Sequence, residues 1–128
     1  MKIKVLNIVE TAYRATLEEQ DDTVIWFLRT IQGAGAGIDV LLVGNAVSYL
    51  DRAQDASGLS FGGERQTQPP RIAADLEQLM AAGGTVFAAR EDAAERGLAR
   101  ERCIEGVEWL DRAAVAPLLD RYDRIWYW

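Results

Sequence analysis

Few residues of this chain could do chemistry, because it contains no histidine and a single cysteine, Cys103. A chain with no histidine cannot supply a Ser-His or Cys-His nucleophile pair or a histidine-ligated metal site. Cys103 follows Arg100-Glu101-Arg102, and cationic neighbours can lower the pKa of a thiol and favour the reactive thiolate. Two interpretations stay open for Cys103: a reactive thiol that needs to be exposed, or a small apolar residue packed in the interior.

Other candidate motifs have simpler explanations. Gly33–Gly37 lies after a predicted helix and before a predicted strand, whereas a phosphate-binding loop needs the reverse order. Gly58–Gly63 lacks the Gly-Lys-Ser/Thr ending of a P-loop. An acidic group near the first strand is typical of a solvated helix start more than of a metal site; it consists of Glu10, Glu18, Glu19, Asp21 and Asp22. We therefore expect no metal and no cofactor.

The composition limits the classes of protein to which this chain can belong. The chain has 128 residues, of which 49% are hydrophobic and 27% charged, as expected for one globular domain over residues 1–128. A net charge of −6 and scattered arginines disfavour nucleic-acid binding. No apolar run approaches the roughly 18 residues of a membrane span, and the N-terminus does not resemble a signal peptide. A lone cysteine fits a reducing compartment, so we expect a cytoplasmic protein.

Hydrophobic periodicity predicts alternating strands and helices. Five strands are expected, at 3–9, 38–43, 85–89, 107–110 and 125–128. The first helix should begin at Asp21 or Asp22 and end near Gly33 or Gly35, with a buried stripe of Val24, Phe27, Leu28 and Ile31. A short helix is expected from Asn45 to about Gln54. The next helix should begin at Pro69-Pro70 and turn Ile72, Leu76, Leu79 and Met80 inward. Two more helices are expected, one that begins with an Asp92/Glu95 capping box and one from Asp111 to Tyr122. Pro117 would kink the last helix or place its start later, and 57–68 is predicted to be an irregular connection.

This order of elements predicts an α/β fold, a three-layer α/β/α sandwich around a five-stranded parallel sheet. Ligands of such sheets bind beyond the carboxyl ends of the strands, so we expect any small-molecule site there. The residues placed at that edge are Glu10, Thr11, Tyr13, Asn45, Ala89 and Arg90. Trp126 and Trp128 should point to one side of the last strand, where another subunit could cover them.

Three stretches together resemble the DsrE/DsrF-like family, which includes the TusD-type sulfur-relay proteins. They are Pro69 to Ala89 with its Gly83-Gly84 helix end, Arg96-Gly97-Leu98, and Glu105-Gly106-Val107. In that family a persulfide-carrying cysteine ends the strand, and an Arg-Gly pair follows eight residues later. Counting back from Gly97 reaches Ala89, so the resemblance implies that the family's cysteine is replaced here.

The resemblance implies a DsrEFH-like sandwich with strand order 4-3-2-1-5 and a homo-oligomer, either a trimer or a hexamer. Three functions follow from it. The first is a non-catalytic subunit that binds a small ligand at the strand ends or docks on a sulfur-carrier or redox protein. The second is a sulfurtransferase that uses Cys103, whose thiolate Arg100 or Arg102 would stabilise. The third is a purely structural subunit of a hetero-complex.

Overall fold

The structure, a computed structural model, describes residues 2–13, 24–54, 60–65 and 71–128. Its elements are, in chain order, β1 (Lys4–Val9), α1 (Val24–Gly33), β2 (Gly37–Leu42), the 3-10 helix η1 (Gly44–Leu50), β3 (Ser60–Phe61), β4 (Glu64–Arg65), α2 (Ile72–Ala81), β5 (Val86–Ala89), α3 (Arg90–Glu95), η2 (Arg100–Arg102), β6 (Glu108–Leu110), η3 (Arg112–Ala114), α4 (Val115–Leu119) and β7 (Arg124–Tyr127). Within the described ranges, no helix has the length and apolar character needed to cross a membrane.

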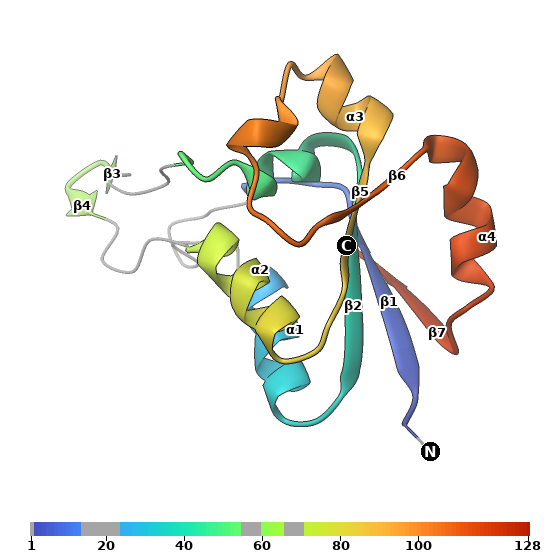
Figure 1. Cartoon of the computed structure of the whole chain (residues 1–128). Coiled ribbons are helices and arrows are strands. Elements are labelled where there is room, and N and C mark those ends of the chain that lie inside the picture. Colours follow the sequence, from blue (N-terminus) through green and yellow to red (C-terminus); the bar gives the residue numbers. More distant parts are fainter. Residues whose placement is uncertain (1, 14–23, 55–59, 66–70) are drawn as a thin grey trace.

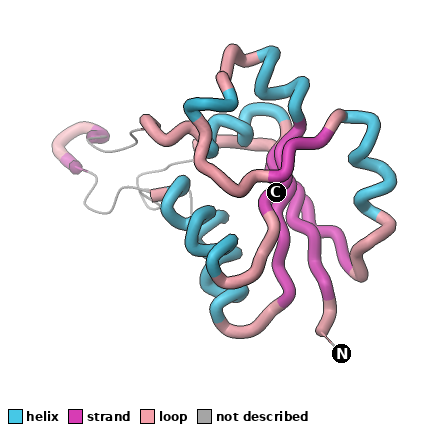
Figure 2. Tube along the Cα trace, viewed as in Figure 1, coloured by secondary structure: helices cyan, strands magenta, loops and turns pink. Residues whose placement is uncertain are grey.

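Five strands form one parallel sheet in the order β6-β5-β2-β1-β7. These are the five predicted strands in the predicted order 4-3-2-1-5, and the α/β sandwich is confirmed. Figure 1 shows the sheet nearly edge-on, with α1 and α2 on one face, α4 on the other and α3 at the end where the strands finish. Figure 2 shows the magenta strands running side by side through the middle of the molecule. Within the predicted irregular connection, β3 and β4 pair as a short antiparallel hairpin.

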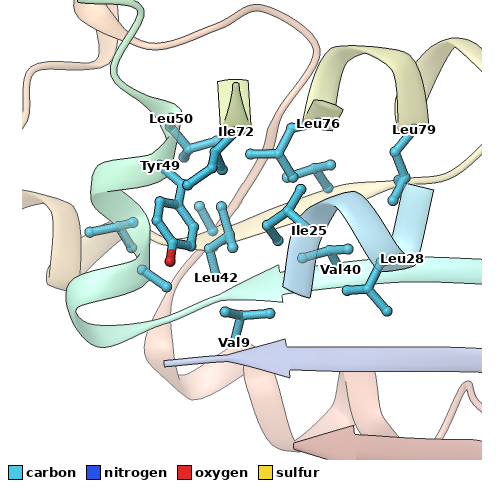
Figure 3. Close-up of a cluster of buried hydrophobic side chains, with 14 of the residues drawn as sticks. Val9, Ile25, Leu28, Val40, Leu42, Tyr49, Leu50, Ile72, Leu76 and Leu79 are labelled. Atoms are coloured by element: carbon cyan, nitrogen blue, oxygen red, sulfur yellow. The ribbon is translucent and has the colours of Figure 1, made fainter. Parts of the chain in front are cut away.

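The larger core lies between the sheet and α1, α2 and η1. Figure 3 shows its aliphatic side chains meeting between the strands and helices, with Tyr49 at one end of the cluster beside Leu50 and Ile72. β1 contributes Val5 and Val9 to this face and turns Leu6 to the other, since side chains alternate along a strand. Burying each such aliphatic side chain stabilises the fold by about 1.5–3 kcal/mol. The second face holds a smaller cluster of Leu6, Leu41, Phe87 and Leu118 beneath α4.

The predicted stripe of α1 is partly wrong. Val24 and Leu28 are buried, but Phe27 is 38% exposed, while Ile25 and Gln32 are buried in addition. Phe27 packs edge-on against the Trp128 ring at 6.1 Å, beside the edge of the sheet, where the core ends. Periodicity finds the apolar side of a helix but cannot tell how far the neighbouring sheet extends beneath it. The helix ends at Gly33 as predicted, whereas its predicted aspartate cap lies outside the described residues.

The helix predicted from Asn45 to Gln54 is instead the shorter 3-10 helix η1, and Asn45 does not cap it. The turn begins at Gly44, whose φ of 54° lies in the left-handed region that favours glycine. The Asn45 Oδ1 accepts a hydrogen bond from Nε of Arg96 at 3.0 Å. The predicted stripe of α2 faces the core: Ile72, Leu76 and Leu79 are buried, and Met80 is partly buried against them. Its predicted Pro69-Pro70 start lies outside the described residues.

The capping predictions for the last two helices are wrong. α3 begins at Arg90, directly after β5, so Asp92 lies inside its first turn and its carboxylate makes tertiary contacts instead. Asp111 forms no side-chain cap either, because it pairs with Arg90. The predicted long helix consists of η3 and the short α4, which begins at Val115. Pro117 therefore lies in the first turn of α4, where a missing N–H does no harm.

Candidate functional site

Charged side chains beyond the carboxyl ends of β5 and β6 bind one another and the turn after β2. Asp92 is the centre of this arrangement: its carboxylate accepts a 2.8 Å hydrogen bond from the N–H of Gly44 and a 2.5 Å contact from Nη2 of Arg112. Burial alone would raise the pKa of Asp92, but the Gly44 hydrogen bond and the Arg112 guanidinium outweigh it and hold that pKa below its ordinary value. Asp92 is therefore a carboxylate that ties the turn after β2 to α3 and η3.

The surrounding charges are paired in the same way. Both carboxylate oxygens of Glu91 accept the backbone N–H of Arg112 at 2.9 Å, which lowers the pKa of Glu91. The Arg112 guanidinium also contacts Glu95 at 3.2 Å, and Arg90 pairs with Asp111. These groups satisfy one another across the strand ends. These pairs thus connect α3 with η3 and with the turn after β2, and none of the charged groups named here is free to act as an acid-base pair on a ligand.

The six predicted site residues lie at the ends of β1, β2 and β5. Glu10 lies close to Gly44, where a Cβ would stand 3.1 Å from Cγ of Glu10, and both Glu10 and Asn45 are exposed. Thr11 is exposed as well, and Arg90 turns to Asp111. Ala89 is 1% exposed at the end of β5. An alanine methyl group at this point offers no nucleophile.

Tyr13 joins the segment after β1 to η1. Its N–H donates to the hydroxyl of Tyr49 at 2.7 Å, its own hydroxyl donates to Oε1 of Gln54 at 2.9 Å, and the two tyrosine rings meet edge-on at 4.9 Å. Burial, followed by the charge of Asp51, raises the pKa of Tyr13. Its φ of 55° is uncommon for a residue other than glycine, and these contacts hold it there. Tyr13 therefore has a structural role, because its contacts fix the segment after β1 to Tyr49 and Gln54.

Cys103 lies in the core and is 3% exposed. Its thiol donates to the carbonyl of Ala99 at 3.5 Å. Burial and the charge of Asp51 raise the pKa of Cys103 despite the opposing effects of Arg52 and Arg102. The expected stabilisation of the thiolate is therefore outweighed: Arg102 pairs with Asp51 at 2.8 Å, and Arg100 lies over the ring of Trp109. The sulfurtransferase hypothesis needs an exposed thiolate, and the structure gives a buried thiol.

An exposed aromatic surface forms on β7, beyond the two tryptophans singled out in the sequence. A shallow hollow of about 490 Å3 is lined by Phe27, Ile125, Trp126, Tyr127 and Trp128, which we call the β7 surface. Trp126 and Trp128 do lie on one side of the strand, by the alternation of the ladder. For Ile125 and Tyr127 the signal in the sequence was the unbroken apolar run 125–128. An edge strand that faces water normally carries polar residues, and this run has none.

Among the described residues, no group of three or more acidic or cysteine side chains is placed to hold a metal ion. The predicted acidic run is mostly outside the described residues, at Glu18, Glu19, Asp21 and Asp22.

Comparison with known proteins identifies the fold. No known protein family and no curated protein match the sequence. Among solved structures, the YchN protein from E. coli matches with a TM-score of 0.65 at 18% identity, over 98% of this chain and 99% of that one. A protein of unknown function from Methanobacterium thermoautotrophicum, MTH1491, matches with a TM-score of 0.59 at 16% identity, over 98% of each chain. A conserved protein of unknown function from Bacteroides thetaiotaomicron, BT1422, matches with a TM-score of 0.60 at 14% identity, over 98% of this chain and 95% of that one. The chain shares the fold of these three proteins along nearly its whole length.

Proposed function

We propose that the chain is a non-catalytic, cytoplasmic DsrE/F-like protein of sulfur metabolism that works as a homo-oligomeric docking subunit. The family resemblance around Gly83-Gly84 and Arg96-Gly97, and the strand order that it implies, support the family part. Ala89 at the family's cysteine position and the burial of Cys103 support the non-catalytic part. Mutual pairing of the charges at the strand ends favours docking over a ligand pocket at that edge.

The exposure of β7 is the observation that carries the proposal. Strands of a parallel sheet are normally covered on both faces. In β7, however, Ile125 is 41% exposed, Trp126 39% and Tyr127 65%, and Phe27 beside them is 38% exposed. An uncovered edge strand with this much apolar surface would be prone to pair with another chain. We therefore propose that a partner covers the β7 surface.

A second copy of the chain fits this edge. The N–H of Trp128 donates to Ile8, and the carbonyl of Trp128 accepts from Glu10, so the even-numbered residues bond inward to β1. By the alternation of a parallel ladder, Ile125 and Tyr127 turn their N–H and C=O groups outward. Two copies running antiparallel would exchange these bonds, Ile125 of one with Tyr127 of the other. Trp126 would then lie opposite its own copy, in a non-hydrogen-bonded pair whose side chains come closest.

The charge of the surface also favours self-association. Its five side chains carry no formal charge, whereas the side chains of the whole chain sum to −6. Two copies that meet through it keep their acidic side chains away from the centre of the contact. Pairing about a twofold axis gives an even number of subunits, such as a dimer or the hexamer that the resemblance implies.

Sedimentation equilibrium of the purified protein tests the proposal. We expect an even-numbered oligomer, and we expect Trp126→Lys to reduce it to smaller species because a charge would be buried at the twofold axis. Trp26→Lys is the matched control, since Trp26 is an equally large residue, 50% exposed, outside the β7 surface. A wild-type protein that stays monomeric at high concentration, or a Trp126→Lys variant with unchanged mass, contradicts self-association. A monomer that forms a stable complex with a different subunit would favour the hetero-complex instead.

A further inference from the structure

A second hollow, of about 310 Å3, lies beside β6 and shares no lining residue with the β7 surface or the paired charges at the strand ends. This volume is at the small end of the range of about 300–1,000 Å3 that ligand pockets occupy. The side chains that bear on its chemistry are Arg52, Arg100, Glu101, Cys103, Glu105 and Trp109. Sequence reasoning considered Cys103 with its neighbours Arg100 and Arg102, but it did not predict that Arg52, Glu105 and Trp109 line the same cavity.

The floor of the cavity is apolar and fixed. Cys103 and Ile104 line it and are only 3% and 4% exposed. Cys103 pairs with Asp51 in an isolated β-bridge, and the N–H of Ile104 donates to the carbonyl of Leu50 at 2.9 Å. These backbone contacts join the segment after η2 to the end of η1. The floor is therefore formed before any ligand arrives.

Two arginines at the cavity lack an acidic partner within the described part of the chain. Five other described arginines pair with Asp or Glu, namely Arg29, Arg90, Arg96, Arg102 and Arg112, whereas Arg65, Arg71, Arg121 and Arg124 form no ion pair with a described residue and lie outside the cavity. Arg52 donates to the backbone carbonyl of Glu101 at 2.5 Å, and the Arg100 guanidinium lies 5.5 Å from the centre of the Trp109 ring. Both guanidinium groups are thus positioned by the protein while their charges are left for another group.

Two carboxylates accompany them. Glu101 and Glu105 line the same cavity, and neither forms an ion pair with another described residue. Two positive and two negative side chains therefore border one apolar floor. A ligand with a single charge would be attracted by either the two arginines or the two glutamates and repelled by the other two side chains. A zwitterion can meet both, with its anionic end at the arginines and its cationic end at the glutamates.

We infer that this cavity binds a free α-amino acid with an aliphatic side chain. The α-carboxylate lies at Arg52 and Arg100, the α-ammonium group at Glu101 and Glu105, and the aliphatic side chain on the floor of Cys103 and Ile104. The raised pKa of Cys103 is consistent with this arrangement, since it keeps the floor neutral. The inference does not depend on self-association through the β7 surface.

Isothermal titration calorimetry with three compounds of matched shape tests the charge requirement. L-leucine carries both charges, isocaproate only the carboxylate and isoamylamine only the ammonium group. We expect L-leucine to bind saturably and each of the other two to bind at least tenfold more weakly. The inference is overturned by a wild-type protein that does not bind L-leucine, or by isocaproate or isoamylamine binding as tightly as L-leucine.

Variants locate the site. Arg100→Gln should weaken L-leucine binding at least tenfold, whereas Arg121→Gln, which changes an exposed arginine outside the cavity, should leave it unchanged. Glu105→Gln should weaken L-leucine binding and leave isocaproate binding unchanged, because it removes only the partner of the ammonium group. This second variant also decides the question if Arg100→Gln does not fold. The proposed site is wrong if Glu105→Gln binds L-leucine as tightly as the wild type does and Arg100→Gln either binds it equally tightly or does not fold. Sedimentation of the same samples measures their oligomeric state. A failure of the amino-acid site can therefore be distinguished from a failure of self-association through the β7 surface.

Discussion

The indole Nε1 of Trp128 donates a 3.0 Å hydrogen bond to Oδ1 of Asn7, whose side chain is fully buried in β1. The Nδ2 of Asn7 in turn donates to the backbone carbonyl of Asp39 on β2 at 3.3 Å. One amide therefore joins the residue after the edge strand to two interior strands. A buried amide in an apolar layer is tolerated when both of its ends have partners, as they do here.

Removing this amide should weaken the attachment of the chain end to the sheet. We expect Asn7→Ala to lower the free energy of unfolding by about 2 kcal/mol, because the Trp128 indole N–H loses its acceptor and a small cavity remains. Trp128→Phe keeps a ring and removes the donor, and should cost about 1 kcal/mol. Urea denaturation measures both. The double variant should lose less than the sum of the single losses; strict additivity would mean that the two side chains do not interact.

The paired carboxylate of Asp92 predicts a loss of stability in acid. Its pKa is lower in the folded protein than the ordinary value of 3.8, so the unfolded chain takes up a proton first as the pH falls. The stabilisation is present above that ordinary value and is lost as the pH falls through the folded pKa. Urea denaturation between neutral pH and about pH 2 should show this decline.

Asp92→Asn isolates that contribution. The variant should be less stable at neutral pH, since Arg112 loses its charged partner, and its stability should fall less steeply in acid. Asp111→Asn is the control, because the Asp111 side chain is 63% exposed and its pair with Arg90 is open to water. An acid profile of Asp92→Asn that parallels the wild type would show that Asp92 does not govern the decline.

Two glycines give a matched test of packing. A Cβ at Gly84 would stand 2.4 Å from Cδ2 of Leu79 and 2.8 Å from the carbonyl oxygen of Ile38, whereas a Cβ at Gly33 would have nothing within 4 Å. Gly84→Ala should therefore cost about 1–3 kcal/mol through overpacking. Gly33→Ala, at the end of α1, should be neutral or stabilise by up to about 1 kcal/mol. Equal melting temperatures for the two variants would contradict the close approach of Gly84 to β2.

The strands were predictable from the sequence because their apolar runs are long relative to their flanks. The two runs that give β1 and β2 supply the centre of the sheet, and a fully buried strand needs little else to be recognised. The spacing of Asp92 and Glu95 wrongly predicted a capping box at the start of α3, and the reason is physical. A capping box is a local contact, but Asp92 finds its partners at Gly44 and Arg112, far away in the sequence.

The candidate site was less predictable, because sequence spacing places residues at an edge without saying which of them pair. Glu10 and Arg90 both follow strands as expected, yet Arg90 is taken up by Asp111. The cavity beside β6 could not be foreseen either. It depends on the bridge between Asp51 and Cys103, two residues that only the tertiary fold brings together.

The accessibility of Cys103 distinguishes the proposed docking subunit from the sulfurtransferase hypothesis. To accept sulfur, the Cys103 thiolate would have to attack the outer sulfur of a donor persulfide, form a new S–S bond and displace the donor thiolate. A thiol that is 3% exposed, with its pKa raised by burial and by Asp51, should not do this. We expect native protein incubated with a cysteine desulfurase and cysteine to show no mass gain.

Thiol labelling gives the same distinction without a sulfur donor. Cys103 in native protein should react with a thiol reagent only as fast as the protein opens, and at once after denaturation. Cys103→Ser is the control for both experiments. A gain of one sulfur mass that is lost in Cys103→Ser, together with rapid labelling of the native protein, would mean that a donor reaches the Cys103 thiol in the folded protein. The chain would then be a sulfurtransferase that has moved its nucleophile away from position 89, and the non-catalytic proposal would be wrong even if the β7 surface still joined the subunits.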